Sequence, residues 1–198
     1  MSHPVTPSLL EFVTRHTQHF DDSHNVQHAL DVYKNAVTIA ITDYPEYDDD
    51  ILQYACMLHD VCDHKYADES ISMEALTQFV YDSLPEAKAT LVLDIINNIS
   101  YSQEIKGKRK TLSETGGHRM YQDIVSDADK LEAIGTVGID RCIAYTRKCS
   151  GVIPADVVKH CHEKLLTLYP GNYIRTPTGR MLAGPLHDQI VSYMRMHL

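Results

Sequence analysis

Apolar residues recur at helical spacing along most of the chain. In residues 24–40 the apolar positions fall three or four residues apart, as one face of a helix requires: Val26, Leu30, Tyr33, Val37 and Ala40. The same spacing predicts further helices over residues 50–60, 68–84, 86–100, 118–134, 137–148, 154–168 and 183–197. No segment alternates apolar and polar residues as a half-buried strand does, and no Asn-Gly or Asp-Gly turn marks a hairpin. The pattern predicts an all-α fold.

Two polar stretches interrupt this pattern. Residues 101–117, YSQEIKGKRKTLSETGG, predict a long loop, and residues 169–181 predict a second irregular stretch before the last helix. Loops of such length are commonly functional or mobile. Neither stretch has the composition of a linker, and there is no internal repeat. We therefore predict one domain over residues 1–198.

Charge and cysteine content narrow the function classes. The formal net charge is −9, which does not suit broad nucleic-acid binding, because that depends on neutralising phosphates. The five cysteines are odd in number and contain no CxxC, so we predict reduced thiols. No apolar run reaches the roughly 18–20 residues of a membrane span, and the N-terminus has no secretory pattern. These features predict a cytoplasmic protein without a membrane partner.

Ionisable residues cluster where one predicted helix ends. In the stretch YACMLHDVCDHKY, residues 54–66, His59 and Asp60 close an apolar segment, and Asp63, His64 and Lys65 follow. Neighbouring residues on a helix point about 100° apart. His59 and Asp60 can therefore share one ion only where the helix is ending. The cluster suggests a metal or substrate site at that helix end.

Two other segments add matching ligand types. His24 stands near a predicted helix start in DDSHNVQH, and Asp127 and Asp129 stand in VSDADKLEAIG. Imidazoles and carboxylates together form a mixed nitrogen and oxygen site, which suits Mn, Fe, Co, Ni, Zn or Mg. His28 shares a helix face with His24 and offers a rival metal pair. Each element also has an ordinary interpretation, such as helix packing for His24.

The two aspartates are ranked differently by different arguments. Ile124, Ala128 and Leu131 define a buried face, and Asp127 lies nearer that face than Asp129 does. Periodicity therefore points to Asp127 as the inward-facing residue. The alternative, that both aspartates form a solvated acidic face, is left open by the pattern.

The order of these residues resembles the HD-domain metal-dependent phosphohydrolase superfamily. The order is His24, then His59-Asp60, then the aspartate of ADKL. Longer stretches, FDDSHNVQHALDV, MLHDVCDHKY, NNISYS and DADKLEAIGTVGIDR, with the tail RTPTGRMLA, resemble its uncharacterised YedJ-like subgroup. The resemblance covers about residues 10–195. It implies an HD-type helical bundle, one divalent cation and hydrolysis of phosphate esters or anhydrides.

The resemblance also implies roles for individual residues. Its metal ligands fall on His24, His59, Asp60 and Asp129, with Asp127 as an alternate ligand or a residue behind the ligands. Asp63 is expected to transfer a proton, although it could equally cap the helix end. Because basic residues must offset the negative charge of a phosphate, Lys65 is expected beside Asp63 as a catalytic residue, and Lys108, Arg109 and Arg141 are the expected contacts to the substrate. For the lysines and arginines of the 101–117 stretch, a solvated loop is the competing interpretation.

Two functions follow from the sequence. The first is a metal-dependent phosphohydrolase that acts on a small phosphorylated molecule, with a nucleotide as the favoured class. The second is a catalytically weak, metal-containing module that senses a nucleotide or a protein. The sequence has no Gly-rich nucleotide cradle that would name the substrate, and it leaves the oligomeric state open.

Overall fold

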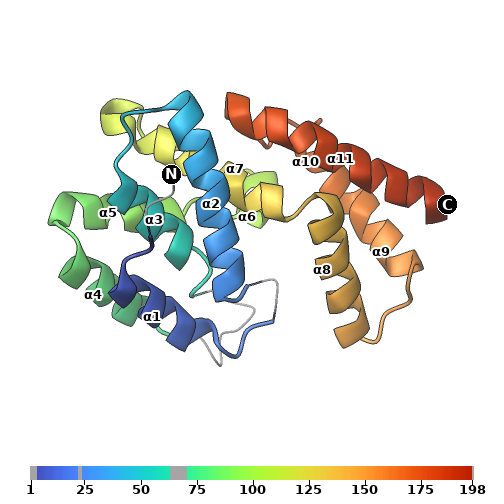
Figure 1. Ribbon diagram of the computed structural model, residues 1–198, viewed down its shortest axis with the longest axis horizontal. Coiled ribbons are helices and arrows are strands. Elements are labelled where there is room, and N and C mark those ends of the chain that lie inside the picture. The colour runs from blue at the N-terminus through green and yellow to red at the C-terminus, as the bar shows by residue number, and fades with distance from the viewer. Residues whose placement is uncertain (1–3, 22–23, 63–70, 198) are drawn as a thin grey trace. The chain divides into compact units, whose positions relative to one another are not determined.

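A computed structural model describes residues 4–21, 24–62 and 71–197, and the described residues form helices and connecting segments without a strand (Figure 1). The all-α prediction is confirmed. The elements are α1 (Pro7–Thr17), α2 (Val26–Asp43), α3 (Asp49–Leu58), α4 (Met73–Ser83), α5 (Glu86–Ile96), α6 (Tyr101–Ile105), the 3-10 turn η2 (Thr115–Gly117), α7 (His118–Glu132), α8 (Gly135–Lys148), α9 (Ala155–His160), the π-helical turn η3 (Cys161–Leu165), α10 (Leu166–Leu168) and α11 (Pro177–His197).

The chain divides into two compact units, Met1–Ser126 and Asp127–Leu198, and the boundary falls inside α7. In the first unit, α3 packs against both α2 and α5, while α1 packs against α2 and α3, and α4 against α5 (Figure 1). In the second unit, α8 packs against α9 and α11, and α11 also contacts η3 and α10. A single HD domain over residues 1–198 stays a prediction.

Three differences from the sequence predictions go beyond a shift of a few residues at a helix end. The pattern missed α1, whose buried positions are Leu9, Val13 and Thr17. The stretch 101–117 contains the short helix α6 and the turn η2 in addition to irregular chain. Helix α11 starts at Pro177, inside the stretch expected to be irregular, because proline is well tolerated in a helix's first turn.

Helix α3 is the centre of the first unit. Every residue from Ile51 to Leu58 is buried, as expected for a helix enclosed by other elements. The Asp48 side chain caps its start by accepting a hydrogen bond from the Asp50 backbone N–H at 3.1 Å. At the other end, His59 and Asp60 follow directly after the buried run. The packing of α3 in the core therefore determines where His59 and Asp60 lie.

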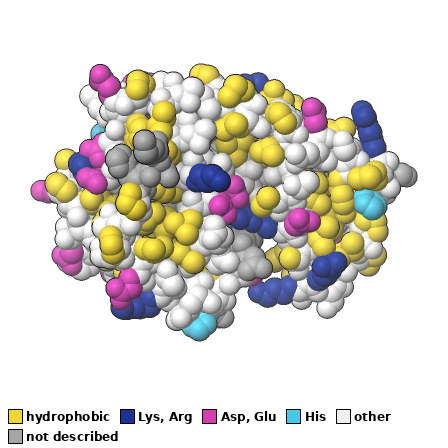
Figure 2. All heavy atoms as spheres, in the orientation of Figure 1, with side chains coloured by type: hydrophobic (Ala, Val, Ile, Leu, Met, Phe, Trp, Pro, Cys, Tyr) yellow, Lys and Arg dark blue, Asp and Glu magenta, His cyan; other side chains and the backbone are white. Residues whose placement is uncertain are grey.

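The molecular surface mixes charges of both signs. On the face in Figure 2, acidic and basic side chains are dispersed among polar and apolar atoms. Within the part of the chain that the structure describes, no helix has both the length and the hydropathy that a bilayer span needs.

A buried polar network connects the N-terminal segment to α2 and α3. Gln53 is 4% exposed, and its Oε1 accepts hydrogen bonds from the Thr6 backbone N–H at 2.9 Å and from the Thr6 hydroxyl at 2.8 Å. Its amide nitrogen donates to the Tyr33 hydroxyl at 3.3 Å, and that hydroxyl donates to the Asp49 carboxylate at 2.9 Å. Burial holds the pKa of Tyr33 well above its usual range. One glutamine therefore satisfies donors and acceptors from three segments.

Replacing Gln53 with alanine should lower the free energy of unfolding by about 2–4 kcal/mol, because buried polar groups lose their partners and a cavity forms. Urea unfolding followed by far-ultraviolet circular dichroism measures this change. The exposed Gln27→Ala is the matched control, and it should change stability by no more than about 0.5 kcal/mol. Equal stability losses in the two variants would contradict the proposed importance of the Gln53 network.

Candidate metal centre

Three side chains of the first unit converge at the end of α3. His28 from α2, with His59 and Asp60 after α3, place one ligand atom each within 4.8 Å of one another. His59 Nε2 lies 3.1 Å from Asp60 Oδ2, and His28 Nε2 lies 3.4 Å from the same oxygen. Among the described residues, this is the group of three or more histidine, cysteine or acidic side chains that could hold a metal ion.

The start of α2 places His28. The Asn25 side chain accepts hydrogen bonds from the backbone N–H groups of Gln27 at 2.9 Å and His28 at 3.1 Å, so the helix begins at Val26. His28 then lies in the first turn and is only 3% exposed, four residues before the buried Val32. Its imidazole consequently points to the core side of α2, toward the end of α3.

The orientation of His59 is fixed by its own helix. The His59 Nδ1–H donates to the Cys56 carbonyl oxygen at 2.7 Å, one turn earlier. In the neutral ring this leaves the lone pair on Nε2, which is the atom nearest Asp60. A carbonyl that holds the second ring nitrogen is a usual support for a metal-ligating histidine.

The donor atoms fit a divalent cation. A neutral imidazole nitrogen and a carboxylate oxygen both carry lone pairs, so a separation of 3.1 Å calls for a proton or a cation between them. Two ligand atoms held about 2.1 Å from an ion at right angles are about 3 Å apart. Nitrogen and oxygen donors without a thiolate suit several divalent metals, and they do not single out one.

Electrostatics favour the ionised form of Asp60. Burial opposes its ionisation, but His59 and His28 outweigh that effect, through hydrogen bonds and through positive charge when an imidazole is protonated, and hold the pKa of Asp60 well below its usual range. Asp60 is therefore a carboxylate at neutral pH. An anionic oxygen between two imidazoles is an arrangement that attracts a cation.

His24, the ligand expected from the resemblance, lies outside this group of three. Its ring centroid is 6.2 Å from that of His28, and its Nδ1 is 3.5 Å from Asp21 Oδ1. The structure brings His28, which the sequence offered only as the partner of His24 in a rival metal pair, to His59 and Asp60. The sequence could have indicated His28, because a histidine on the buried face of a helix needs a polar partner. The ligand role of His24 stays a prediction.

Asp127 is a buried structural anchor of the second unit. It has no exposed surface, which confirms that it faces inward, and its Oδ2 accepts hydrogen bonds from the Thr176 N–H at 2.6 Å and the Arg175 N–H at 2.8 Å. Burial raises the pKa of Asp127 to about 6, although these donors and Lys130 act in the opposite direction. Asp127 thereby ties α7 to the segment that begins α11.

Space around this anchor is tight. A Cβ on Gly179 would lie 2.5 Å from Thr176 Oγ1 and 3.0 Å from Asp127 Oδ2, so glycine permits the close approach. Asp129 is partly exposed on the same helix. The assignment of Asp129 as the metal-ligating aspartate stays a prediction, as does the alternative that Asp127 is the ligand or supports it.

The other expected site residues are Asp63, Lys65, Lys108, Arg109 and Arg141, of which Arg141 lies on α8 in the second unit. Asp63 and Lys65 lie outside the described residues. Lys108 is exposed, whereas the side chain of Arg109 is 7% exposed and donates to Glu104 at 3.0 Å, Asp123 at 2.9 Å and the Asn98 carbonyl. Arg109 thus anchors the segment after α6 within the first unit. A substrate phosphate would have to compete with two carboxylates for its guanidinium.

Comparisons with known proteins point to one family. No family model matches the chain. The uncharacterized protein YpgQ of Bacillus subtilis is 31% identical over 151 residues, which make up 73% of this chain and 69% of YpgQ. The uncharacterized protein L803 of Acanthamoeba polyphaga mimivirus is 27% identical over 147 residues, covering 70% of this chain and 58% of L803.

Solved structures share the fold. The crystal structure of Bacillus subtilis YpgQ in complex with ADP matches with a TM-score of 0.76 at 25% identity, over 96% of this chain and 93% of YpgQ. A Lactobacillus plantarum protein matches with a TM-score of 0.76 at 22% identity, over 98% and 97% of the two chains. An HD-superfamily hydrolase from Bacillus thuringiensis matches with a TM-score of 0.70 at 23% identity, over 96% and 93%.

Removing either core histidine should empty the metal centre. We expect His28→Ala and His59→Ala each to reduce bound divalent metal per chain to near zero, because each removes one of three clustered donors. Elemental analysis of the purified variants measures this content. The exposed His19→Ala is the control and should keep its metal. Metal lost in His24→Ala but retained in His28→Ala would reverse the choice between the two histidines.

The two aspartates should separate in a stability experiment. Asp127→Ala leaves the Arg175 and Thr176 N–H groups without their acceptor, so we expect the free energy of unfolding to fall by about 2–4 kcal/mol. Asp127→Asn keeps an acceptor oxygen and should lose less. Asp129→Ala, at a partly exposed position, should cost less than Asp127→Ala. Chemical unfolding of metal-free protein tests this order, and a larger loss in Asp129→Ala would contradict it.

Proposed function

The chain belongs to the HD-domain superfamily, in the family of YpgQ, and we propose on that premise that it is a metal-dependent phosphohydrolase. Its substrate is a small phosphorylated molecule of the nucleotide class, cleaved at a phosphate ester or anhydride. The grouping of His28, His59 and Asp60 carries this proposal. Membership of the YedJ-like subgroup stays a prediction.

The substrate class is supported by one relative. YpgQ has a crystal structure in complex with ADP, and the structural match to this chain covers 93% of the YpgQ chain. A nucleotide offers both a phosphate ester and a phosphate anhydride, so it suits either reaction of the proposed class. We therefore propose nucleotides for this chain.

The residues of the centre have distinct tasks in the proposed reaction. A divalent cation, when bound, supplies Lewis acidity that lowers the pKa of water and polarises a phosphoryl oxygen. The Cys56 carbonyl holds the His59 ring in the tautomer whose Nε2 can donate a lone pair. The low pKa of Asp60 keeps its carboxylate available at neutral pH. The buried His28 completes the set from α2.

Proton transfer is assigned to Asp63 on the basis of the sequence. A carboxylate close to the ligands could orient a water molecule or protonate the leaving oxygen. Asp63 comes three positions after Asp60 and lies outside the described residues, so its role rests on the resemblance.

A sensor module is the second candidate. The same observation that supports a nucleotide substrate, the complex of YpgQ with ADP, also fits a protein that binds a nucleotide without turnover. The two candidates share the metal centre. They differ only in whether a phosphate bond is broken.

Turnover decides between these candidates. We expect wild-type protein with added Mn²⁺ or Co²⁺ to release phosphate or pyrophosphate from at least one member of a panel of nucleotides and phosphate esters. Chelation and His59→Ala should each abolish release, because both remove the Lewis acid. Colorimetric phosphate assay, with pyrophosphatase added for the second product, measures the rate.

His19→Ala is the matched control and should turn over like wild type, since His19 is exposed and outside the centre. Retained nucleotide binding without turnover on the whole panel would support the sensor and refute the hydrolase. Equal release by wild type and His59→Ala would refute the assignment of the centre.

A further inference from the structure

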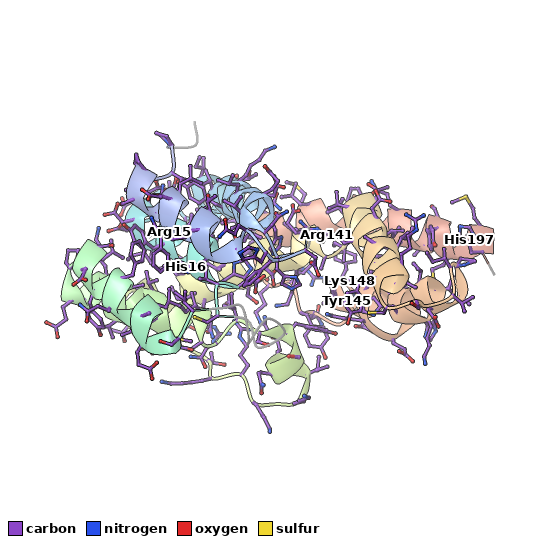
Figure 3. All side chains as sticks on the ribbon, turned by 90° about the horizontal axis from the view of Figure 1, so that it is seen from below. Arg15, His16, Arg141, Tyr145, Lys148 and His197 are labelled. Carbon is purple, nitrogen blue, oxygen red and sulfur yellow. The ribbon has the colours of Figure 1, made fainter. Side chains whose placement is uncertain are left out.

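We infer that α8 carries a nucleotide-recognition face, on which Arg141 binds a phosphate group and Tyr145 stacks on the base. The ligand class rests on the proposed function. The placement of the two residues rests on the second unit alone. Figure 3 labels Arg141, Tyr145 and Lys148 on this helix.

The three residues share one side of α8. They are separated by four and three positions, the spacing that places side chains on one helix face. With a rise of about 1.5 Å per residue, Tyr145 stands about 6 Å along the helix from Arg141 and about 4.5 Å from Lys148. The face therefore offers a cation, an aromatic ring and a second cation in order along the helix.

Arg141 is held in place and retains donor capacity. Its Nη1 donates to the Glu132 carbonyl oxygen at 3.2 Å, and its Nη2 lies 3.5 Å from Glu132 Oε2. A guanidinium has five N–H groups. These contacts use two of them, and the others have no acceptor among the residues that the structure describes. A group already oriented by Glu132, with donors to spare, is suited to a phosphate.

Tyr145 supplies an unusually open aromatic surface. It is 60% exposed, although aromatic side chains usually bury most of their area. Every nucleobase has a π-face, so an exposed ring can stack on any of them. An aromatic ring set between two cations matches a ligand that joins a planar base to anionic phosphates.

The charge of this face differs from that of the chain. The chain carries a formal net charge of −9, whereas the Arg141, Tyr145 and Lys148 face has two cations. Lys148 is exposed at the end of α8, where its ammonium can attract a polyanion. Cations alone would suit inorganic phosphate equally well. The ring is the feature that favours a nucleotide.

Paired non-hydrolysable ligands test this inference directly. α,β-Methylene-ADP contains the base, whereas methylenediphosphonate contains only the two phosphorus groups. By calorimetry, Tyr145→Ala should weaken methylene-ADP binding about tenfold, since one base stack is lost, and leave methylenediphosphonate unchanged. Arg141→Gln should weaken both ligands by about tenfold. Tyr145→Phe keeps the ring and should recover most of the affinity for methylene-ADP.

Two variants control for surface changes. Tyr81→Ala removes another exposed tyrosine, 42% exposed on α4, and should bind both ligands like wild type. Arg147→Gln removes a charge from α8 at a position off the Arg141 and Tyr145 face, and it should also bind like wild type. Equal melting temperatures for all variants confirm that differences arise from binding.

The outcomes separate this inference from the proposed function. Wild-type affinity of Tyr145→Ala for methylene-ADP overturns the inference, even if the protein releases phosphate from nucleotides. An equal loss of both ligands in Tyr145→Ala also overturns it and leaves a phosphate site. No binding of methylene-ADP by wild type overturns it as well. Binding that depends on Tyr145, without turnover of any panel member, supports the inference and refutes the hydrolase.

Discussion

The hydrogen bond from His59 Nδ1 to the Cys56 carbonyl controls the candidate centre. The last residues of α3 are buried, and His59 and Asp60 are the next two residues of the chain. By bonding to its own last turn, His59 satisfies one ring nitrogen and presents the other to Asp60 at 3.1 Å. The same bond selects the tautomer that can ligate a metal. Burial of α3 therefore determines both where the centre lies and which atom faces it.

The surroundings of α3 make this geometry rigid. Gln53 and Tyr33 connect α3 to the N-terminal segment and to α2, and α2 carries His28 into the same region. The helix cap at Asn25 sets the first turn of α2, so the position of His28 depends on backbone hydrogen bonds and not on its own contacts alone. Ligands that come from packed helices are held more precisely than ligands on loops. This is the arrangement that a metal centre requires.

Two polar residues that are also predicted site residues make structural contacts, and their roles in a site stay predictions. Asp127 accepts the backbone N–H groups that precede α11, and Arg109 bridges Glu104 and Asp123 near α6. Both side chains are almost completely buried, and a buried charge is tolerated only when hydrogen bonds or partners compensate its lost hydration. Conversely, Tyr145 drew no attention in the sequence, yet its exposure beside Arg141 makes it a candidate for base recognition.

The amino-acid pattern by itself determined the helical class, most helix positions and the importance of His59 and Asp60. These depend on local spacing, because a helix repeats every 3.6 residues and a buried face must be apolar. Tertiary structure decided what spacing could not. His24 and His28 lie four residues apart in sequence, but α2 begins at Val26, so only His28 lies on the helix, and the packing of α2 against α3 brings it to the pair. Likewise periodicity pointed to Asp127 as the inward-facing aspartate but could not supply its partners, because Arg175 and Thr176 are distant along the chain. Contacts between residues far apart in sequence arise from packing, which a local pattern does not encode.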